Sequence, residues 1–154
     1  MFRGRRTFKP MRFLIILTIA LSGCALPRWP VDGVLTSPFG VRMDGLMPEI
    51  HRGVDISVPI GTPVLAMKGG RVVFAGTMSG YGTTLIIENG ATRTLYAHLS
   101  ELKVRAGDQV RSHQVVALSG ASGNAAGPHL HFEILRYGRH EDPVPLLGGF
   151  PRPR

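Results

Sequence analysis

The stretch His129-Leu130-His131-Phe132-Glu133 alternates polar and apolar side chains. Because successive side chains of a β-strand point to opposite faces, this pattern predicts a strand whose two histidines share one face. The leucine and the phenylalanine share the other face, which suits a packed core. Two imidazoles beside large apolar residues need polar partners when they are buried, and a zinc ion is one such partner.

The rest of the chain contains further short apolar runs separated by turn signals. The clearest runs are 64–66, 71–74, 84–87, 93–96, 115–118 and 129–135. The pairs Gly69-Gly70, Asn89-Gly90 and Gly107-Asp108 lie between runs and are typical of hairpin turns. No stretch shows a long apolar period of 3.6 residues. We therefore predict an all-β domain from residue 33 onward, built of short strands joined by turns.

The first 23 residues have the pattern of an export signal. Basic residues precede the apolar run 13–21, which is too short to span a bilayer. The run ends in Leu21-Ser22-Gly23-Cys24, which resembles a bacterial lipobox, and the chain has 1 cysteine. We predict lipidation at Cys24. An ordinary secretory signal with an incidental cysteine is the alternative.

These features divide the chain into a signal peptide at 1–23, a tether at 24–32, one folded domain and a loose tail at 147–154. Lipidation of Cys24 would add a diacylglyceryl group and an amide-linked acyl chain. Together these chains would anchor the protein to a membrane, because stable anchoring takes more than one acyl chain. Ala25 follows the cysteine, a pattern that resembles outer-membrane lipoproteins of Gram-negative bacteria. We expect an exported, lipid-anchored monomer that faces the periplasm in a Gram-negative host.

The formal net charge of +8 is unevenly distributed. The signal region holds Arg3, Arg5, Arg6, Lys9 and Arg12 and no acidic residue, which leaves 13 basic against 10 acidic residues in the rest of the chain. The sequence has no basic stripe interleaved with aromatic residues. The composition therefore predicts no nucleic-acid partner.

A second candidate metal-binding segment is His51-Arg52-Gly53-Val54-Asp55. On one extended strand, His51, Gly53 and Asp55 would share a face, and the glycine would leave open space for an ion. Val54 would then point into a core. A surface strand with an unrelated histidine and aspartate is the alternative.

Together the two segments supply three candidate zinc ligands, which are His51, Asp55 and one of His129 and His131. Zinc takes two neutral nitrogens and one carboxylate in a tetrahedral site, and a catalytic site keeps the fourth position for water. One histidine of the pair is then left close to the metal. A further histidine, His98, lies on or at the end of another predicted strand.

Three motifs, His51-x-x-x-Asp55, Tyr96-Ala97-His98 and residues 127–133, resemble those of the lysostaphin-like, LytM-type zinc endopeptidases. The segment 36–42 and Tyr81-Gly82 resemble the same family, so the resemblance covers about residues 33–146. It implies a duplicated-hybrid-motif fold, in which antiparallel sheets form a substrate groove over residues 33–146, and hydrolysis of peptide cross-links in peptidoglycan.

The resemblance also implies a role for each residue. His51, Asp55 and His131 would bind one Zn2+, and His98 and His129 would be the catalytic histidines. Glu133 shares a strand face with His131 and is a candidate partner for its ring, with a surface arginine as the alternative partner. We interpret His113 and His140, which lie outside the motifs, as surface residues.

Three other functions compete with this hypothesis. Some proteins of the fold lose zinc ligands and bind the cell wall or activate amidases, whereas all five residues are present here. Ala66-Met67-Lys68 resembles a biotin-attachment motif, but the second methionine is missing and an exported chain would not meet cytosolic ligases. A structural lipoprotein with adventitious zinc would require three matched motifs to be accidental.

Overall fold

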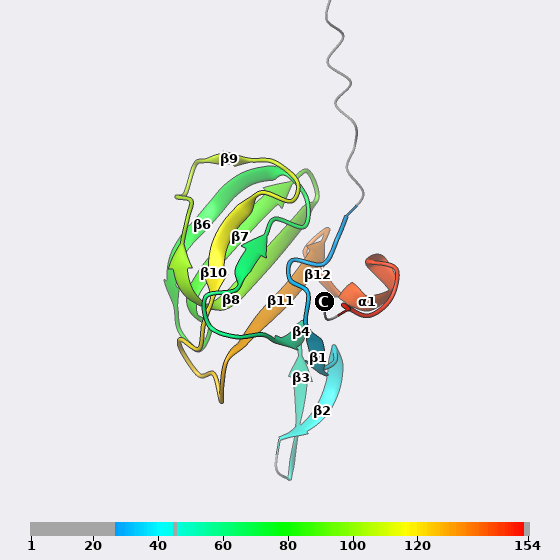
Figure 1. Cartoon of the computed structure of the whole chain (residues 1–154). Helices are drawn as coiled ribbons and strands as arrows, with labels where there is room; N and C mark the ends of the chain where they lie inside the picture. The colour runs from blue at the N-terminus through cyan, green and yellow to red at the C-terminus, as the bar shows by residue number, and fades with distance from the viewer. Residues whose placement is uncertain (1–26, 45, 153–154) are drawn as a thin grey trace, which may run out of the picture.

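The computed structural model describes residues 27–44 and 46–152, so the expected signal peptide and Cys24 lie outside the described residues. Figure 1 shows a body built almost entirely of β-strands. The elements are β1 (Val34–Ser37), β2 (Gly40–Asp44), β3 (Met47–His51), β4 (Val54–Ser57), β5 (Pro63–Leu65), β6 (Gly70–Met78), β7 (Gly82–Asn89), β8 (Thr92–Leu102), β9 (Gln109–Val110), β10 (Val115–Ser119), β11 (His129–Arg136), β12 (Arg139–Glu141) and α1 (Pro143–Leu146). The all-β prediction is confirmed, and the six clearest predicted runs coincide with β5, β6, β7, β8, β10 and β11, except that Ala66 lies just beyond the end of β5.

One 10-stranded sheet contains β1, β4, β11, β8, β7, β6 and β9 side by side in this order. All of its pairs with known register are antiparallel. The long strand β8 pairs with β11 through its first half and with β10 near its end. β2 and β3 form a separate two-stranded hairpin that projects from the body in Figure 1.

The core side of β4 and β11 is the apolar face that the sequence predicts. Val54, Ile56, Leu130 and Phe132 are all 0% exposed. Full burial of such a side chain contributes about 1.5–3 kcal/mol. Because the core holds these faces inward, the opposite faces of the two paired strands bring their polar side chains together.

One of the three predicted hairpin turns is correct. Asn89-Gly90 joins β7 to β8, and Gly90 has a φ of 59°. Gly69-Gly70 forms no hairpin, because β5 pairs with β10 and not with β6. Gly107-Asp108 forms none either, because the following strand β9 pairs with β6. Gly70 instead permits close strand packing, since a Cβ there would lie 2.2 Å from the carbonyl oxygen of Glu88.

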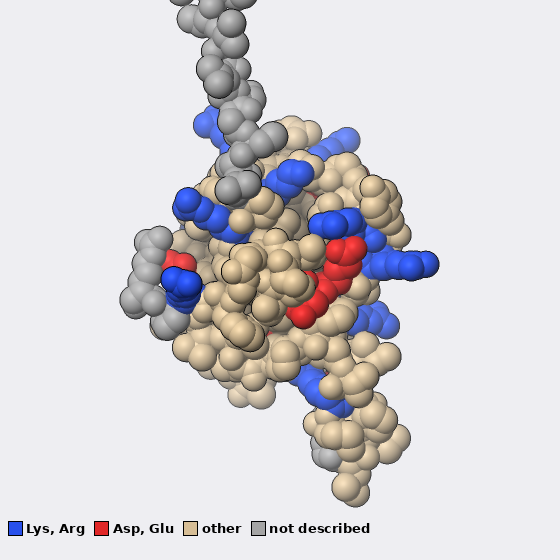
Figure 2. Space-filling view, turned by 90° about the vertical axis from the view of Figure 1, so that its right-hand side faces the viewer, with Lys and Arg blue, Asp and Glu red and all other residues tan. Residues whose placement is uncertain are grey.

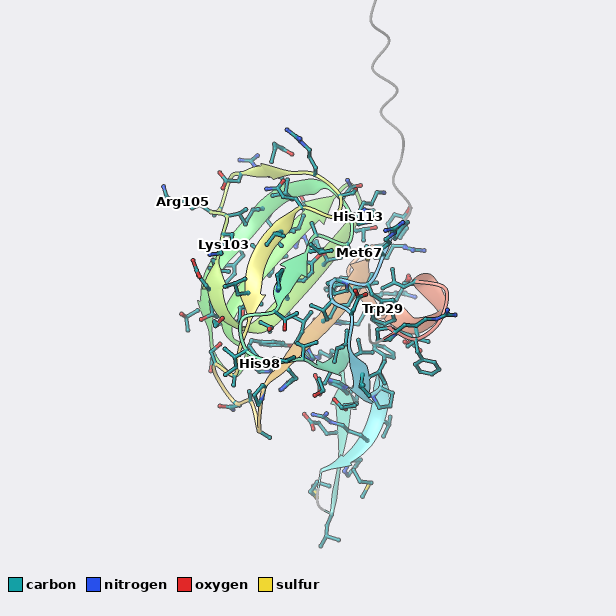
Figure 3. All side chains as sticks on the ribbon, viewed as in Figure 1. Trp29, Met67, His98, Lys103, Arg105 and His113 are labelled. Carbon is teal, nitrogen blue, oxygen red and sulfur yellow. The ribbon has the colours of Figure 1, made fainter. Side chains whose placement is uncertain are left out.

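The packed domain extends beyond residues 33–146 at both ends. Val31, in the predicted tether, is 3% exposed and belongs to the core. The indole of Trp29 donates to the carbonyl oxygen of Gly149 at 2.9 Å, and Figure 3 shows Trp29 beside the C-terminal helix. Leu147 packs against the core, so the described part of the predicted tail is attached to the domain. Within the described residues, no helix is long and apolar enough to cross a membrane.

Candidate functional site

Asp55 of β4 and His131 of β11 are direct partners in the antiparallel register. Their side chains meet on the polar face, where Oδ1 of Asp55 lies 2.7 Å from Nδ1 of His131. Gly53 allows this approach, because a Cβ there would lie 2.4 Å from the carbonyl oxygen of Phe132. The prediction that Gly53 leaves open space for an ion is therefore wrong. The glycine lets the backbone of one strand pack against the other.

His51 reaches the site from a different element. The prediction of a single strand over residues 51–55 is wrong, since β3 ends at His51 and β4 begins at Val54. His51 nevertheless faces Asp55, with Nε2 3.3 Å from Oδ1. Its Nδ1 lies 2.7 Å from the carbonyl oxygen of Pro38, which can only accept a hydrogen bond. Nδ1 therefore carries the proton, and Nε2 keeps a free lone pair.

Three ligand atoms converge at this point: Nε2 of His51, Oδ1 of Asp55 and Nδ1 of His131 lie within 4.8 Å of one another. Nε2 of His131 is 3.0 Å from Oε1 of Glu133, which leaves Nδ1 as the ligand atom of that ring. The donor set and the satisfied outer nitrogens fit a tetrahedral zinc site with one open position. The residues alone left the choice between His129 and His131 open, and the structure brings His131 to the other two.

The site favours a positive ion. Burial by itself would raise the pKa of Asp55, but the neighbouring rings of His131 and His51 outweigh burial and hold it well below its usual range. Burial likewise opposes ionisation of Glu133, yet hydrogen bonds from His131 and Tyr81 lower its pKa. Both carboxylates are therefore ionised near neutral pH, and a cation between the ligand atoms would balance their charge.

His98 and His129 lie beside the three ligands, with 4.7 Å between the centroids of their rings. Nδ1 of His98 is 2.8 Å from the carbonyl oxygen of Ser122, and Nδ1 of His129 is 2.8 Å from that of Gly127. Each Nδ1 therefore carries the proton and each Nε2 can accept one. Nε2 of His129 lies 3.7 Å from Oδ1 of Asp55. Burial, the largest cause, lowers the pKa of His98 and keeps its ring neutral.

A β-bulge sets the direction of His98. The β7–β8 register pairs Leu85 with Tyr96 and Thr83 with Leu99, which leaves one extra residue in β8. Tyr96 and Leu99 consequently both face the core although they are three positions apart. His98 has a φ of 58°, a left-handed conformation that a non-glycine residue rarely adopts. Bulges re-aim side chains next to active sites, and local sequence gave no sign of this one.

Glu133 connects the ligand His131 to two further side chains. It is 1% exposed, and its Oε1 accepts from the hydroxyl of Tyr81 at 2.8 Å as well as from His131. Its Oε2 lies 2.9 Å from Nε2 of His140. The interpretation of His140 as a surface residue is therefore wrong: the half-buried ring contacts a buried carboxylate. Burial and Glu133 raise the pKa of Tyr81 to about 12.

Sequence reasoning did not identify Arg42 as a functional residue. Its Nη1 lies 2.8 Å from Oγ of Ser37 and 3.4 Å from Oδ2 of Asp55. Its Nε donates to Glu49 on the neighbouring strand of the hairpin at 3.1 Å. Arg42 therefore attaches the projecting hairpin to the site. Its place in the segment 36–42, which resembles the family, was the one available signal.

All five predicted metal and catalytic residues line one open groove of about 540 Å³. The groove is lined by Arg42, Glu49, Ile50, His51, Arg52, Asp55, Gly80, Tyr81, His98, Asn124, Ala126, His129, His131 and Glu133. A larger cavity of about 660 Å³, near both ends of the described chain, includes His113 and none of the five. Figure 3 shows His98 and His113 at opposite ends of the body, and Figure 2 shows scattered basic side chains on one face.

Several known proteins are similar to this chain in sequence or in fold. The murein hydrolase activator EnvC of Escherichia coli strain K12 is 36% identical over 152 residues, which cover 95% of this chain and 36% of EnvC. The DD-carboxypeptidase/endopeptidase Mpg of Neisseria meningitidis serogroup B is 39% identical over 113 residues, or 71% of this chain and 26% of Mpg. The chain thus spans about a third or less of the length of these curated relatives.

A zinc-containing peptidase from Vibrio cholerae has a similar structure, with a TM-score of 0.73 and 35% sequence identity. The similarity covers 82% of this chain and 40% of that one. Residues 49–143 also match the family model described as Peptidase family M23. These residues contain all five predicted metal and catalytic positions, and they make up more than half of the chain. The chain belongs to Peptidase family M23.

Proposed function

We propose that this protein is a zinc-dependent endopeptidase that hydrolyses peptide cross-links in bacterial peptidoglycan. The observation that carries the proposal is the convergence of three ligand atoms in an open groove, with two further histidines at their side. An open groove suits a polymeric substrate, whose chain must enter and leave on both sides of the scissile bond.

The proposed role of each residue follows from the atom that it presents to the groove. His51, Asp55 and His131 would hold the metal through Nε2, Oδ1 and Nδ1. Bound Zn2+ would polarise the scissile carbonyl and lower the pKa of water from about 15.7 to about 7. His98 and His129 each present an Nε2 that can accept a proton, because a backbone carbonyl holds the proton of each Nδ1. Once protonated, such a ring can donate to the departing amine or stabilise developing negative charge.

The second candidate is a non-catalytic regulator that binds the cell wall or activates amidases. The similarity to EnvC, an activator by its name, is the observation that favours it. The complete set of ligands and histidines favours the enzyme instead. A protein that only binds a partner has no need for two histidines whose free nitrogens lie beside a metal-ligand set.

Purified protein that begins at Ala25 tests the two candidates directly. We expect about one Zn2+ per chain and release of soluble fragments from peptidoglycan. Asp55→Ala should lose both zinc and activity, whereas His129→Ala should retain zinc and lose activity. Zinc binding without hydrolysis by the unmodified protein, or hydrolysis by a metal-free preparation, would contradict the proposal. Mass spectrometry of the released fragments identifies the bond that is cut.

We also propose that a lipid on Cys24 anchors the domain to a membrane, the outer membrane in a Gram-negative host. The lipobox-like sequence and the basic-apolar signal support this proposal. Cys24→Ser should move the protein from the membrane fraction to the soluble fraction. Unchanged fractionation of the variant would argue against lipidation.

A further inference from the structure

Glu133 is an almost fully buried carboxylate with a partner on each oxygen. Its side chain is 2% exposed, and its Oε1 accepts hydrogen bonds from Tyr81 and His131. Among the residues that the structure describes, His140 is the one hydrogen-bond partner of Oε2, at 2.9 Å. A buried ionised group that loses a hydrogen-bond partner is strongly disfavoured. The position of this carboxylate therefore depends on a partner at each of its two oxygens.

The backbone places His140 for this contact. β12 follows β11 through the two-residue turn Tyr137-Gly138, whose φ angles are 51° and 76°. Such angles at both central residues are those of the tight turns that match the twist of paired strands. His140 is then opposite Leu135, two residues from Glu133 on the same face. Diagonal neighbours of this kind lie within reach of a long side chain.

The same carboxylate sets the direction of a metal ligand. His131 donates from Nε2 to Glu133 at 3.0 Å and thereby turns Nδ1 toward Asp55. A carboxylate that accepts from the outer nitrogen of a ligating histidine fixes the ring and raises the basicity of the inner nitrogen. We propose that His140 is a positioning residue for the metal site, which acts on His131 by fixing Glu133. This inference rests on the proposed zinc site.

Zinc affinity of the full mature chain, measured by competition with a chelator, tests the proposal without any assay of hydrolysis. We expect His140→Ala to weaken zinc binding by about 10-fold, because loss of such outer partners costs about 10–100-fold. His140→Gln should restore binding to within about 2-fold, since its amide nitrogen can take the place of Nε2. His140→Asn has a shorter side chain that does not reach Oε2, and it should behave like alanine even if the alanine variant folds poorly.

A double-mutant cycle determines whether Glu133 transmits the effect. In a Glu133→Gln background, His140→Ala should change zinc affinity by less than about 2-fold, because the carboxylate that it fixes is absent. The absorption spectrum of Co2+-loaded His140→Ala should also differ from that of the unmodified protein, because the spectrum reports ligand geometry. His113→Ala serves as the matched control, since that half-buried histidine lines the other cavity.

The outcomes separate this inference from the proposed function. Failure of the unmodified chain to bind zinc would overturn both. If the unmodified chain binds zinc and both His140→Ala and His140→Asn bind it with the same affinity as the unmodified chain, the role of His140 alone is overturned. If His140→Ala lowers zinc affinity equally in the unmodified protein and in the Glu133→Gln background, the role is also overturned, because His140 would then act independently of Glu133.

Discussion

Asp55 and His131 face each other across paired strands, 76 residues apart in the chain, with 2.7 Å between Oδ1 and Nδ1. Both side chains lie on the polar face of the two strands, opposite the buried Val54 and Phe132. Their separation depends on the register of β4 and β11 and on the close approach of the two backbones. The contact therefore links the stability of the sheet to the binding of a metal ion.

Zinc should stabilise the folded protein through this contact. A ligand that binds the folded state at about 100 times its Kd contributes about 2.7 kcal/mol. We expect added Zn2+ to raise the melting temperature of the unmodified protein and a chelator to reverse the increase. Asp55→Asn should remove most of the increase, because it removes the charged ligand. An equal zinc-dependent increase in Asp55→Asn would exclude Asp55 from the metal site.

Gly53→Ala should separate the two strands. The added Cβ would meet the carbonyl oxygen of Phe132 at 2.4 Å, and backbone cannot yield as a flexible side chain can. We expect a loss of about 1–3 kcal/mol in the free energy of unfolding, together with weaker zinc binding. Gly127→Ala is the matched control for stability, since its Cβ would meet nothing within 4 Å. Chemical denaturation of both variants gives the comparison, and equal stabilities would contradict the packing argument.

Tyr96 should make the protein less stable at high pH. Burial raises the pKa of its hydroxyl to about 12, compared with about 10 in an unfolded chain. A raised pKa in the folded state contributes stability below pH 10 that is lost as the pH rises toward 12. Tyr96→Phe should therefore show a smaller decrease in unfolding free energy between about pH 9 and 11 than the unmodified protein.

The control for this variant is its stability near neutral pH. Tyr96→Phe also loses the hydrogen bond in which the hydroxyl accepts from the amide of Met67 at 2.9 Å. That loss costs about 1 kcal/mol of unfolding free energy at every pH, so it does not alter the slope of unfolding free energy against pH. Identical slopes in the two proteins would show that Tyr96 does not titrate with unfolding.

Val31→Ala tests whether the domain begins before residue 33. Val31 is 3% exposed, so removing two methyl groups should cost about 1–3 kcal/mol of unfolding free energy. Val34→Ala makes the same chemical change at a side chain that is 55% exposed, and it should cost less than about 0.5 kcal/mol. Thermal or chemical denaturation compares the stabilities of the two variants. A negligible loss of stability in Val31→Ala would agree with a domain that begins at residue 33.

The alternation of residues 129–135 was sufficient to predict β11, its apolar face and the shared face of its two histidines. Side-chain direction in a strand follows from backbone geometry, so no distant residue is needed for that inference. The order of the three motifs was likewise sufficient to indicate the family. The break between His51 and Val54 was not predictable in this way, because it depends on a hairpin that packs outside the main sheet.

Local sequence thus determined which residue types share a strand face, and the tertiary structure decided which of them meet. The partner of Asp55, the role of Arg42 and the contact between His140 and Glu133 all depend on strand register and on side chains from different elements. Register is selected by the packing of whole faces and by turn geometry, and these are properties of the assembled sheet. A ring nitrogen is left free for metal only when the fold supplies an acceptor for the other one, as Pro38 does for His51.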